Sequence, residues 1–297
     1  MRIVVFGGSG FLGSHVADAL IDAGHRVRLF DLKPSPYKKS RQEMVLGDIL
    51  DERAVHTAVR GQDVVFNFAG FADIEAAQTH PLDTIRLNVL GNGIILEACR
   101  RGSVRRYLFA STMYVYSAKP SFYRASKLAC EAYIESYQKL YSLPCTILRF
   151  GSLYGPRANQ KNGIHSYLHQ ALTKRKITYW GDGGEIREYI HVRDAAESCV
   201  EALGKKFANN CLILTGQQSM KMKDLFLMIQ EMFGNTVRIQ FRPGSRKDLA
   251  ELHYRTTPYA YAPRPANKLV RSQYVDLGQG LLGTLEDIRG RIMDSTH

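Results

Sequence analysis

Apolar runs and amphipathic segments alternate through the first half of the chain. Apolar runs typical of buried strands occur at residues 2–7, 26–31, 43–48, 63–70, 105–111 and 145–150. Segments with helical periodicity lie between them, at residues 11–23, 51–61, 81–101 and 121–141. Strands that are apolar throughout and separated by helices are typical of a parallel sheet covered on both faces. The pattern therefore predicts a doubly wound α/β domain over residues 1–150.

The regular alternation ends after Phe150. Gly, Pro and Asn accumulate at residues 151–163, and the elements that follow are shorter. Helical patterns lie near 164–173, from 194 and near 282–294, and strand patterns lie near 177–180, 186–191 and 211–216. We expect residues 151–297 to form a smaller substrate-binding lobe, with segments near 186–217 returning to the first domain. The Pro- and Tyr-rich residues 253–265 carry polar groups that could cap a substrate.

The composition is that of a soluble globular protein. Of the 297 residues, 45% are hydrophobic and 23% are charged, and no apolar run approaches the roughly 18 residues that cross a bilayer. The first residues already have a strand pattern, so we expect no signal peptide, no membrane segment and a cytoplasmic location. Five cysteines without a C-x-x-C pair indicate reduced thiols and no metal site.

The chain is strongly basic, with a net charge of +12 at pH 7. Such an excess suits an anionic partner, such as nucleic acid or a phosphorylated small molecule, or simply a basic solvated surface. The basic residues are spread along the chain, and the densest cluster, residues 33–41, contains one aromatic residue, Tyr37. This distribution favours a basic surface, and we expect no nucleic acid as a partner.

A glycine-rich turn follows the first predicted strand. Gly7, Gly10 and Gly13 form a G-x-x-G-x-x-G pattern that opens the first helix. Such a turn lets backbone N–H groups approach a pyrophosphate, although turns of this kind also occur without a ligand. Asp31 ends the second strand, where a carboxylate accepts the ribose hydroxyls of NAD and repels the 2′-phosphate of NADP. We predict an NAD site, with nearby Lys33 as the residue that weakens the distinction.

Two further strand ends border the same predicted site. Asp48 and Ile49 follow the third strand, where the Asp48 carboxylate suits either the adenine amino group or the N-cap of the next helix. Phe68, Ala69 and Gly70 end the fourth strand, where their backbone would border the cofactor. We therefore include all five residues in the predicted cofactor site.

The segment after the fifth predicted strand carries the candidate chemistry. Thr112 ends that strand, and Tyr123 and Lys127 open the next helix with Y-x-x-x-K spacing. The spacing alone arises about once by chance in a chain so rich in tyrosine. Its position adds weight, because residues four apart share a helix face and ligands bind at the carboxyl ends of parallel strands. The three side chains are predicted to meet where a nicotinamide would lie.

These residue types suit removal of a proton from a sugar hydroxyl. A tyrosine phenol has a pKa of about 10 in water, and an adjacent ammonium group and a cationic nicotinamide ring would lower it. Tyr123 would act as the base while hydride leaves the same carbon, with Thr112 holding the hydroxyl and Lys127 favouring the tyrosinate. In the alternative interpretation, Tyr123 is an ordinary aromatic residue at a helix start.

Together, these motifs resemble the extended short-chain dehydrogenase/reductase superfamily, in its UDP-glucose 4-epimerase-like branch. The similarity covers nearly the whole chain and rests on GGSGFLG, Asp31, GDI, FAG, NVLGN, STMYVY, YRASK, LRFGSLYGPR and GDGGEIREYIHVRD. It implies a Rossmann sheet, bound NAD, a nucleotide-sugar pocket between sheet and lobe, and a homodimer formed through the helix that begins near Tyr123. It also implies cofactor contacts from Phe11, Leu12, Asn88, Tyr123, Lys127 and Phe150.

The same resemblance implies substrate contacts in the lobe. Arg187 is similar to the arginine that holds the substrate diphosphate, Trp180 falls where an apolar residue borders the nucleobase, and Asn162 lies near a polar contact to the nucleotide. A surface charge at Arg187 and a core residue at Trp180 are the alternatives. Ser152 stands where the family often has asparagine, which weakens that contact.

Two other departures from the family pattern bear on the reaction. Family members usually carry a longer loop between the hydroxyl and the tyrosine, whereas Thr112 and Tyr123 are eleven positions apart. The short connection would leave the sugar end of the pocket open, which suits an N-acetyl sugar or a uronic acid. Met113 and Tyr114 stand where related dehydratases carry two acids, which argues against elimination of water.

The sequence thus predicts an NAD-dependent epimerase that oxidises and reduces C4 of a UDP-sugar through a 4-keto intermediate. One alternative is a nucleotide-sugar reductase or dehydrogenase whose cofactor exchanges on each turnover. The other is a non-catalytic NAD-sensing protein, which the intact set of Thr112, Tyr123 and Lys127 disfavours.

Overall fold

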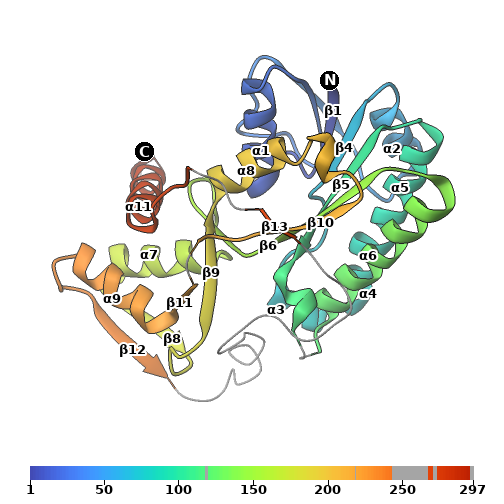
Figure 1. Ribbon diagram of the computed structural model, residues 1–297. Helices are drawn as coiled ribbons and strands as arrows, with labels where there is room; N and C mark the ends of the chain where they lie inside the picture. The colour runs from blue at the N-terminus through green and yellow to red at the C-terminus, as the bar shows by residue number, and fades with distance from the viewer. Residues whose placement is uncertain (118–119, 218, 243–266, 270–272, 295–297) are drawn as a thin grey trace.

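The computed structural model describes residues 1–117, 120–217, 219–242, 267–269 and 273–294. Its centre is a parallel sheet of eight strands in the order β13-β10-β6-β5-β4-β1-β2-β3, with helices on both faces (Figure 1). The doubly wound α/β fold is therefore confirmed. Residues 253–265, which we expected to cap a substrate, lie outside the described residues.

Seven of the eight strands coincide closely with the predicted apolar runs, and the two-residue edge strand β13 was not predicted. They are β1 (Arg2–Phe6), β2 (Arg26–Asp31), β3 (Gln42–Leu46), β4 (Val64–Asn67), β5 (Arg106–Thr112), β6 (Cys145–Phe150), β10 (Asn210–Leu214) and β13 (Asn267–Lys268). In β1, Ile3 and Val5 join one buried core, whereas Val4 and Phe6 join another on the opposite face. A strand that is buried on both faces is apolar throughout, which explains the unbroken runs.

Two layers of helices cover the sheet. On one face, α1 (Phe11–Asp22) packs against α8 (Val192–Glu201). On the other face lie α2 (Glu52–Val59), α5 (Gly91–Arg101) and α6 (Phe122–Tyr141). Because α8 and β10 come late in the chain, the polypeptide returns to the large sheet after it has formed part of the lobe. None of the described helices has the length and hydropathy that a bilayer crossing requires.

The helical pattern at residues 81–101 is not one regular α-helix. After α3 (Ile74–Thr79), α4 (Pro81–Thr84) leads into a π-helical segment, η1 (Ile85–Leu90), which continues into α5. Segments of π-helix are rare and often accompany functional sites. This one carries Asn88 to the end of β4, as described below.

The lobe has a small core of its own. A three-stranded sheet contains β7 (Ser152–Tyr154), β9 (Ile186–His191) and β11 (Ser219–Lys221), and a second pair joins β8 (Lys176–Trp180) to β12 (Arg238–Arg242). Around them pack α7 (Gly163–Lys174), α9 (Met222–Met232) and α11 (Leu277–Asp294) (Figure 1). The sequence pattern predicts α7, β8 and β9 but misses β7, α9 and β12, and it starts α11 too late.

Candidate active site

The glycine turn lies where the strand order of the sheet reverses. β1 has β4 on one side and β2 on the other, and dinucleotides bind at this point in such folds. Gly7 has a φ of +75°, and a Cβ there would lie 2.8 Å from backbone atoms of both Phe68 and Ala69. A Cβ on Gly13 would lie 2.1 Å from the Gly7 carbonyl oxygen. The turn therefore requires glycine at both positions, and it leaves backbone exposed to a ligand.

The N-terminus of α1 is suited to an anion. Its N-cap is Gly10, which makes no side-chain hydrogen bond to the first N–H groups, and the first turn contains no acidic residue. Phe11 and Leu12 open the helix and are half-buried. Uncapped N–H groups and the helix dipole attract phosphate oxygens. The arrangement fits the pyrophosphate of a dinucleotide.

The Asp31 carboxylate is held beside this turn. It accepts hydrogen bonds from the backbone N–H groups of Ser9, at 3.0 Å, and Lys33, at 3.4 Å. The Ser9 hydroxyl donates to the Lys33 carbonyl at 2.7 Å, which ties the loop after β2 to the glycine turn. A fixed, half-buried carboxylate in this place fits the adenosine ribose of NAD.

Asp48 does not cap the next helix. The N-cap of α2 is Asp51, whose carboxylate accepts two backbone hydrogen bonds from the first turn. Asp48 instead accepts from the Leu50 backbone N–H at 2.9 Å, which fixes its side chain just beyond β3. Ile49 is buried, and a Cβ on Gly91 would lie 2.7 Å from it. The helix-cap interpretation of Asp48 is therefore wrong.

Asn88 joins the segment after β4 to the first turn of α6. Its amide nitrogen donates to the Phe71 carbonyl at 3.1 Å and to the Ser126 hydroxyl at 2.8 Å, and its amide oxygen accepts from the Phe71 N–H at 2.6 Å. Gly70 lies so close that a Cβ on it would meet Asn88 at 2.5 Å. Ser126 in turn donates to the Tyr123 carbonyl at 2.8 Å. Asn88 thus orders both the backbone beside the cofactor site and the first turn of α6.

The three candidate catalytic side chains lie together at the end of β5. The Thr112 side chain acts on the Tyr123 phenol and lowers its pKa, and the Lys127 ammonium lies 5.8 Å from the centre of the Tyr123 ring. Lys127 also donates to the Ala110 carbonyl at 2.8 Å and lies 4.7 Å from the centre of the Phe109 ring. Both Thr112 and Lys127 are buried.

The short connection between Thr112 and Tyr123 begins with a compact turn. Residues 113–116 form a 3₁₀ helix, η2 (Met113–Tyr116), and the Thr112 hydroxyl accepts from the Tyr114 N–H at 3.2 Å. Ser121 caps the start of α6 by accepting from the Arg124 N–H at 3.4 Å. The turn and the cap replace the longer loop that the family pattern implies.

The protein alone does not make Tyr123 acidic. Burial raises the pKa of Tyr123 well above its ordinary value, the Tyr114 phenol raises this pKa further, and the Thr112 side chain opposes both effects. Burial also lowers the pKa of Lys127. The Lys127 ammonium by itself therefore does not outweigh burial. A cationic ring beside the phenol is the additional charge that would favour the tyrosinate.

Arg187 reaches the same region from the lobe. Burial raises the pKa of Tyr114, and the Arg187 charge opposes that rise, so Arg187 on β9 acts on the phenol that neighbours Tyr123. Arg187 is half-buried rather than fully exposed, and its Nη1 is buried without a hydrogen-bond partner among the described residues. A guanidinium group with such a nitrogen fits a phosphate group.

Asn162 and Ser152 shape the start of the lobe. Asn162 is the N-cap of α7 and accepts from the His165 N–H at 3.2 Å, while its amide nitrogen donates to the Leu153 carbonyl at 2.7 Å. Ser152 lies on β7, opposite Tyr189 of β9. These contacts show how Asn162 orders the lobe, whereas a contact to the nucleotide stays a prediction.

Trp180 and Phe150 lie at the ends of strands in different sheets. Trp180 ends β8 and is 36% exposed, with the Arg242 guanidinium 5.6 Å from its ring centre. Trp180 is therefore not a core residue. Phe150 ends β6 in register with Thr112 and is buried in the core beneath the sheet.

The sequence analysis does not predict a buried ion pair next to the candidate catalytic residues. Glu131 and Arg149 form an ion pair at 2.6 Å, with relative side-chain exposures of 0% and 2%. The available signal is the position of Glu131, four residues after Lys127 and eight after Tyr123, which places it on the same face of α6. A carboxylate on a buried helix face requires a partner, but the sequence does not identify Arg149 as that partner.

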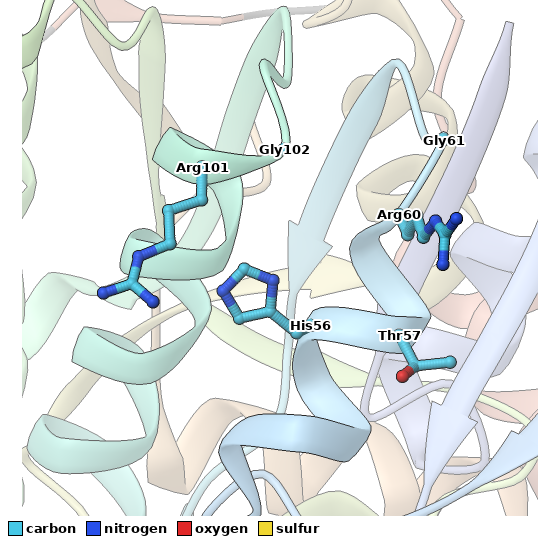
Figure 2. A pocket seen from close by; sticks show the side chains of 6 residues that line it. All are labelled: His56, Thr57, Arg60, Gly61, Arg101 and Gly102. Atoms are coloured by element: carbon cyan, nitrogen blue, oxygen red, sulfur yellow. The ribbon is translucent and has the colours of Figure 1, made fainter.

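A hollow lies at the amino ends of the sheet strands, whereas Tyr123 lies at their carboxyl ends. It forms where α2 and α5 end, and Figure 2 shows the residues that line it: His56, Thr57, Arg60, Gly61, Arg101 and Gly102. These residues precede β4 and β5, so the hollow lies at the amino ends of the strands, away from the candidate chemistry. Within the described ranges, His, Cys, Asp and Glu side chains form no group of three suited to a metal ion.

Known proteins are similar to this chain in sequence and fold. The NAD dependent epimerase/dehydratase family matches residues 3–212. A Bacillus subtilis protein named as an uncharacterized UDP-glucose epimerase, YtcB, is 26% identical over 81% of this chain and 85% of its own length. The UDP-N-acetyl-alpha-D-glucosaminuronate decarboxylase of Bacillus cytotoxicus is 30% identical over 74% of this chain and 76% of its own.

A solved structure extends the similarity to nearly the whole chain. The UDP-glucose 4-epimerase of Thermus thermophilus, in complex with NAD, is 25% identical, covers 98% of this chain and 99% of its own, and has a TM-score of 0.81. The resemblance to the extended short-chain dehydrogenases/reductases is thereby confirmed. With its glycine turn, its Asp31 carboxylate and a family match over most of its length, the chain belongs to the NAD-dependent epimerase/dehydratase family, and its cofactor is NAD.

Proposed function

We propose that the protein is a UDP-sugar 4-epimerase. The observation that carries this proposal is the meeting of Thr112, Tyr123 and Lys127 at the carboxyl edge of the sheet. The glycine turn lies at the same edge, and Arg187 has a buried nitrogen that pairs with none of the described residues. The names of the relatives in Bacillus subtilis and Thermus thermophilus support a UDP-sugar as the substrate.

Side chains of the protein transfer the proton of the sugar C4 hydroxyl. NAD, when bound, supplies reversible hydride transfer at C4 of the sugar. Tyr123 accepts the proton of the C4 hydroxyl as the 4-keto sugar forms, and it returns that proton when the ketone is reduced. Thr112 orients the hydroxyl, and Lys127 adds positive charge beside the tyrosinate. C4 would be inverted if the pocket let the 4-keto sugar turn and present its opposite face before reduction.

An anchored nucleotide and a loosely held sugar suit this inversion. Arg187 would bind the diphosphate, so binding energy remote from C4 retains the intermediate while the sugar turns. Met113 and Tyr114 stand beside Thr112, and neither side chain is an acid that would assist loss of water. These features favour epimerisation over dehydration.

Turnover without added cofactor tests the proposal. We expect the purified protein to convert at least one of UDP-glucose, UDP-N-acetylglucosamine and UDP-glucuronic acid to its C4 epimer, measured by ion-exchange chromatography and NMR. Tyr123→Phe should lower kcat by about 10²–10⁴-fold and retain NAD. Tyr274→Phe is the matched control, because it removes an exposed phenol from the segment before α11. Dependence on added NADPH would favour a reductase, and an active Tyr123→Phe variant would rule out the mechanism.

We further propose that the protein is a homodimer formed through α6. Large exposed side chains on this helix are Tyr133, Leu140 and Tyr141, and Leu82 and Ile85 are exposed on the neighbouring α4 and η1. Several large exposed apolar side chains on adjacent helices favour a protein partner. Sedimentation should give a dimer for the wild type and a monomer for Leu140→Glu, whereas a monomeric wild type would overturn the proposal.

The cysteines support the cytoplasmic location expected from the sequence. The five cysteines all lie in the described part of the chain, where they form no disulfide, and four of them are buried. Cysteines without disulfides are typical of reducing compartments. Fractionation of cells that express the protein tests this location, and recovery outside the cytoplasm would contradict it.

A further inference from the structure

A buried polar cluster lies next to the catalytic residues. We call it the polar clamp; its members are Ser111, Tyr116, Glu131 and Arg149. Arg149 donates to both carboxylate oxygens of Glu131, at 3.0 and 2.6 Å, and to the Tyr116 hydroxyl at 2.6 Å. Ser111 donates to Glu131 at 2.6 Å. The Arg149 guanidinium also lies 4.8 Å from the centre of the Tyr116 ring.

The polar clamp holds the chain on both sides of Thr112. Ser111 immediately precedes Thr112 at the end of β5, and Tyr116 ends η2, four residues after Thr112. Glu131 lies on α6, one helical turn after Lys127 and two after Tyr123. The cluster therefore connects the segment that carries the hydroxyl to the helix that carries the base.

Stability alone does not explain such a cluster. Burying two charges costs several kcal/mol of desolvation, and well-packed apolar residues of similar size are often as stable or more stable. A buried ion pair with satisfied hydrogen bonds instead restricts its segments to one arrangement. Here the restricted segments are η2 and α6, whose relative position decides whether Thr112 meets Tyr123.

We propose that the polar clamp holds the Thr112 side chain in position beside Tyr123, and that Tyr116 is a positioning residue for the reaction. Tyr116 acts through Arg149 and Glu131, whereas Ser111 acts from the other side of Thr112. The proposal rests on the proposed epimerase function, because it concerns the geometry of the same proton transfer.

Tyr116→Phe tests this role with little change of volume. We expect kcat for the C4 epimerisation to fall at least tenfold while KM stays within twofold, because the proton transfer is misaligned and the nucleotide contacts are intact. Tyr107→Phe is the matched control: Tyr107 on β5 is, like Tyr116, a buried phenol whose hydroxyl is hydrogen-bonded, in its case to Asn67 and Asn92. The control should lower Tm by a similar amount while kcat stays within twofold of wild type.

Crystal structures separate this proposal from the proposed function. We expect the distance between the Thr112 hydroxyl and the Tyr123 phenol to be longer in Tyr116→Phe, and in the second variant Ser111→Ala, than in the wild type. An unchanged distance in both variants overturns the positioning role, whether or not the wild type epimerises a UDP-sugar. Equal loss of kcat in Tyr116→Phe and Tyr107→Phe also overturns it. A wild type that retains NAD but converts no UDP-sugar counts against the proposed function alone.

Discussion

The glycine turn after β1 and the connection from Thr112 to Tyr123 reach defined geometries by different means. In the turn, backbone meets backbone: a single added carbon at Gly13 would lie 2.1 Å from the Gly7 carbonyl oxygen. In the connection, the geometry depends on side chains, above all the bidentate contact between Arg149 and Glu131. The first constraint is local in sequence, whereas the second joins residues 18 positions apart.

The difference teaches where each region is vulnerable. A steric constraint of the backbone fails completely when one methyl group is added, because the surrounding backbone has no free space. A polar cluster fails in stages, since each hydrogen bond contributes separately and neighbouring groups relax. We expect substitutions in the turn to abolish cofactor binding and substitutions in the cluster to reduce stability or rate by measurable amounts.

The largest expected effect is at Gly13. Gly13→Ala places a Cβ in contact with the Gly7 carbonyl, so the start of α1 must shift and the pyrophosphate site is lost. We expect no NAD to remain bound after purification, measured by absorbance after denaturation. Gly93→Ala is the matched control, because a Cβ on Gly93 in α5 meets no atom of the described residues within 4 Å. Retention of NAD by Gly13→Ala would show that the turn can accommodate a side chain at residue 13.

The next largest effect is expected in the buried ion pair. Glu131→Gln removes the charge that Arg149 faces with 0% and 2% side-chain exposure. Loss of one partner of such a pair costs about 3–5 kcal/mol of unfolding free energy, measured by urea denaturation. Arg100→Met is the control, because its ion pair with Glu97 is partly exposed and screened by solvent, so its loss should cost much less unfolding free energy. Similar losses in the two variants would refute the contrast between buried and exposed pairs.

The smallest expected effect concerns His191, whose ring is closely packed and whose pKa is lowered. A Cβ on Gly155 would lie 3.0 Å from the His191 ring, and burial lowers the pKa of His191 from 6.5 to about 4. As pH falls below 6.5, the unfolded chain therefore binds a proton before the folded protein does, and stability is lost down to about pH 4. Between pH 7 and pH 5 this costs about 2 kcal/mol.

His191→Asn isolates that contribution. Asparagine retains an N-cap acceptor for the Arg193 N–H, which the His191 ring accepts at 3.3 Å. Urea denaturation should show a smaller decrease in unfolding free energy between pH 7 and pH 5 for the variant than for the wild type. Equal decreases would mean that His191 does not titrate with a lowered pKa.

The same contrast explains how much the sequence reveals. The eight-stranded sheet was predictable in outline, because strands buried on both faces are continuously apolar. The position of Tyr123 and Lys127 followed from strand order and helical spacing. The role of Asp51 as the helix cap could not be predicted, because Asp48, three residues earlier, has the same side chain. Only the backbone geometry decides which carboxylate reaches the first turn.

Long-range polar contacts could not be predicted from the sequence. The contact of Tyr116 with Arg149 joins residues 33 positions apart, and neither residue has a spacing that indicates the other. The π-helical segment that carries Asn88 was equally hidden, since its apolar periodicity differs little from that of an α-helix. The short and largely exposed β12 shows little apolar pattern. The helix α9 was missed although its buried Met222, Leu225, Phe226 and Ile229 have helical spacing.

Transfer of an isotope label tests the proposed reaction most directly. UDP-glucose that carries deuterium at C4 should be incubated with the protein as purified, without added NAD, and the product examined by ¹H NMR and mass spectrometry. If Tyr123 moves only the hydroxyl proton and the hydride returns to its own carbon, we expect the C4 epimer with the deuterium still at C4. If UDP-glucose is not a substrate, the same label belongs in whichever UDP-sugar is converted. Product that has exchanged its C4 deuterium for solvent hydrogen would contradict oxidation and reduction at that carbon.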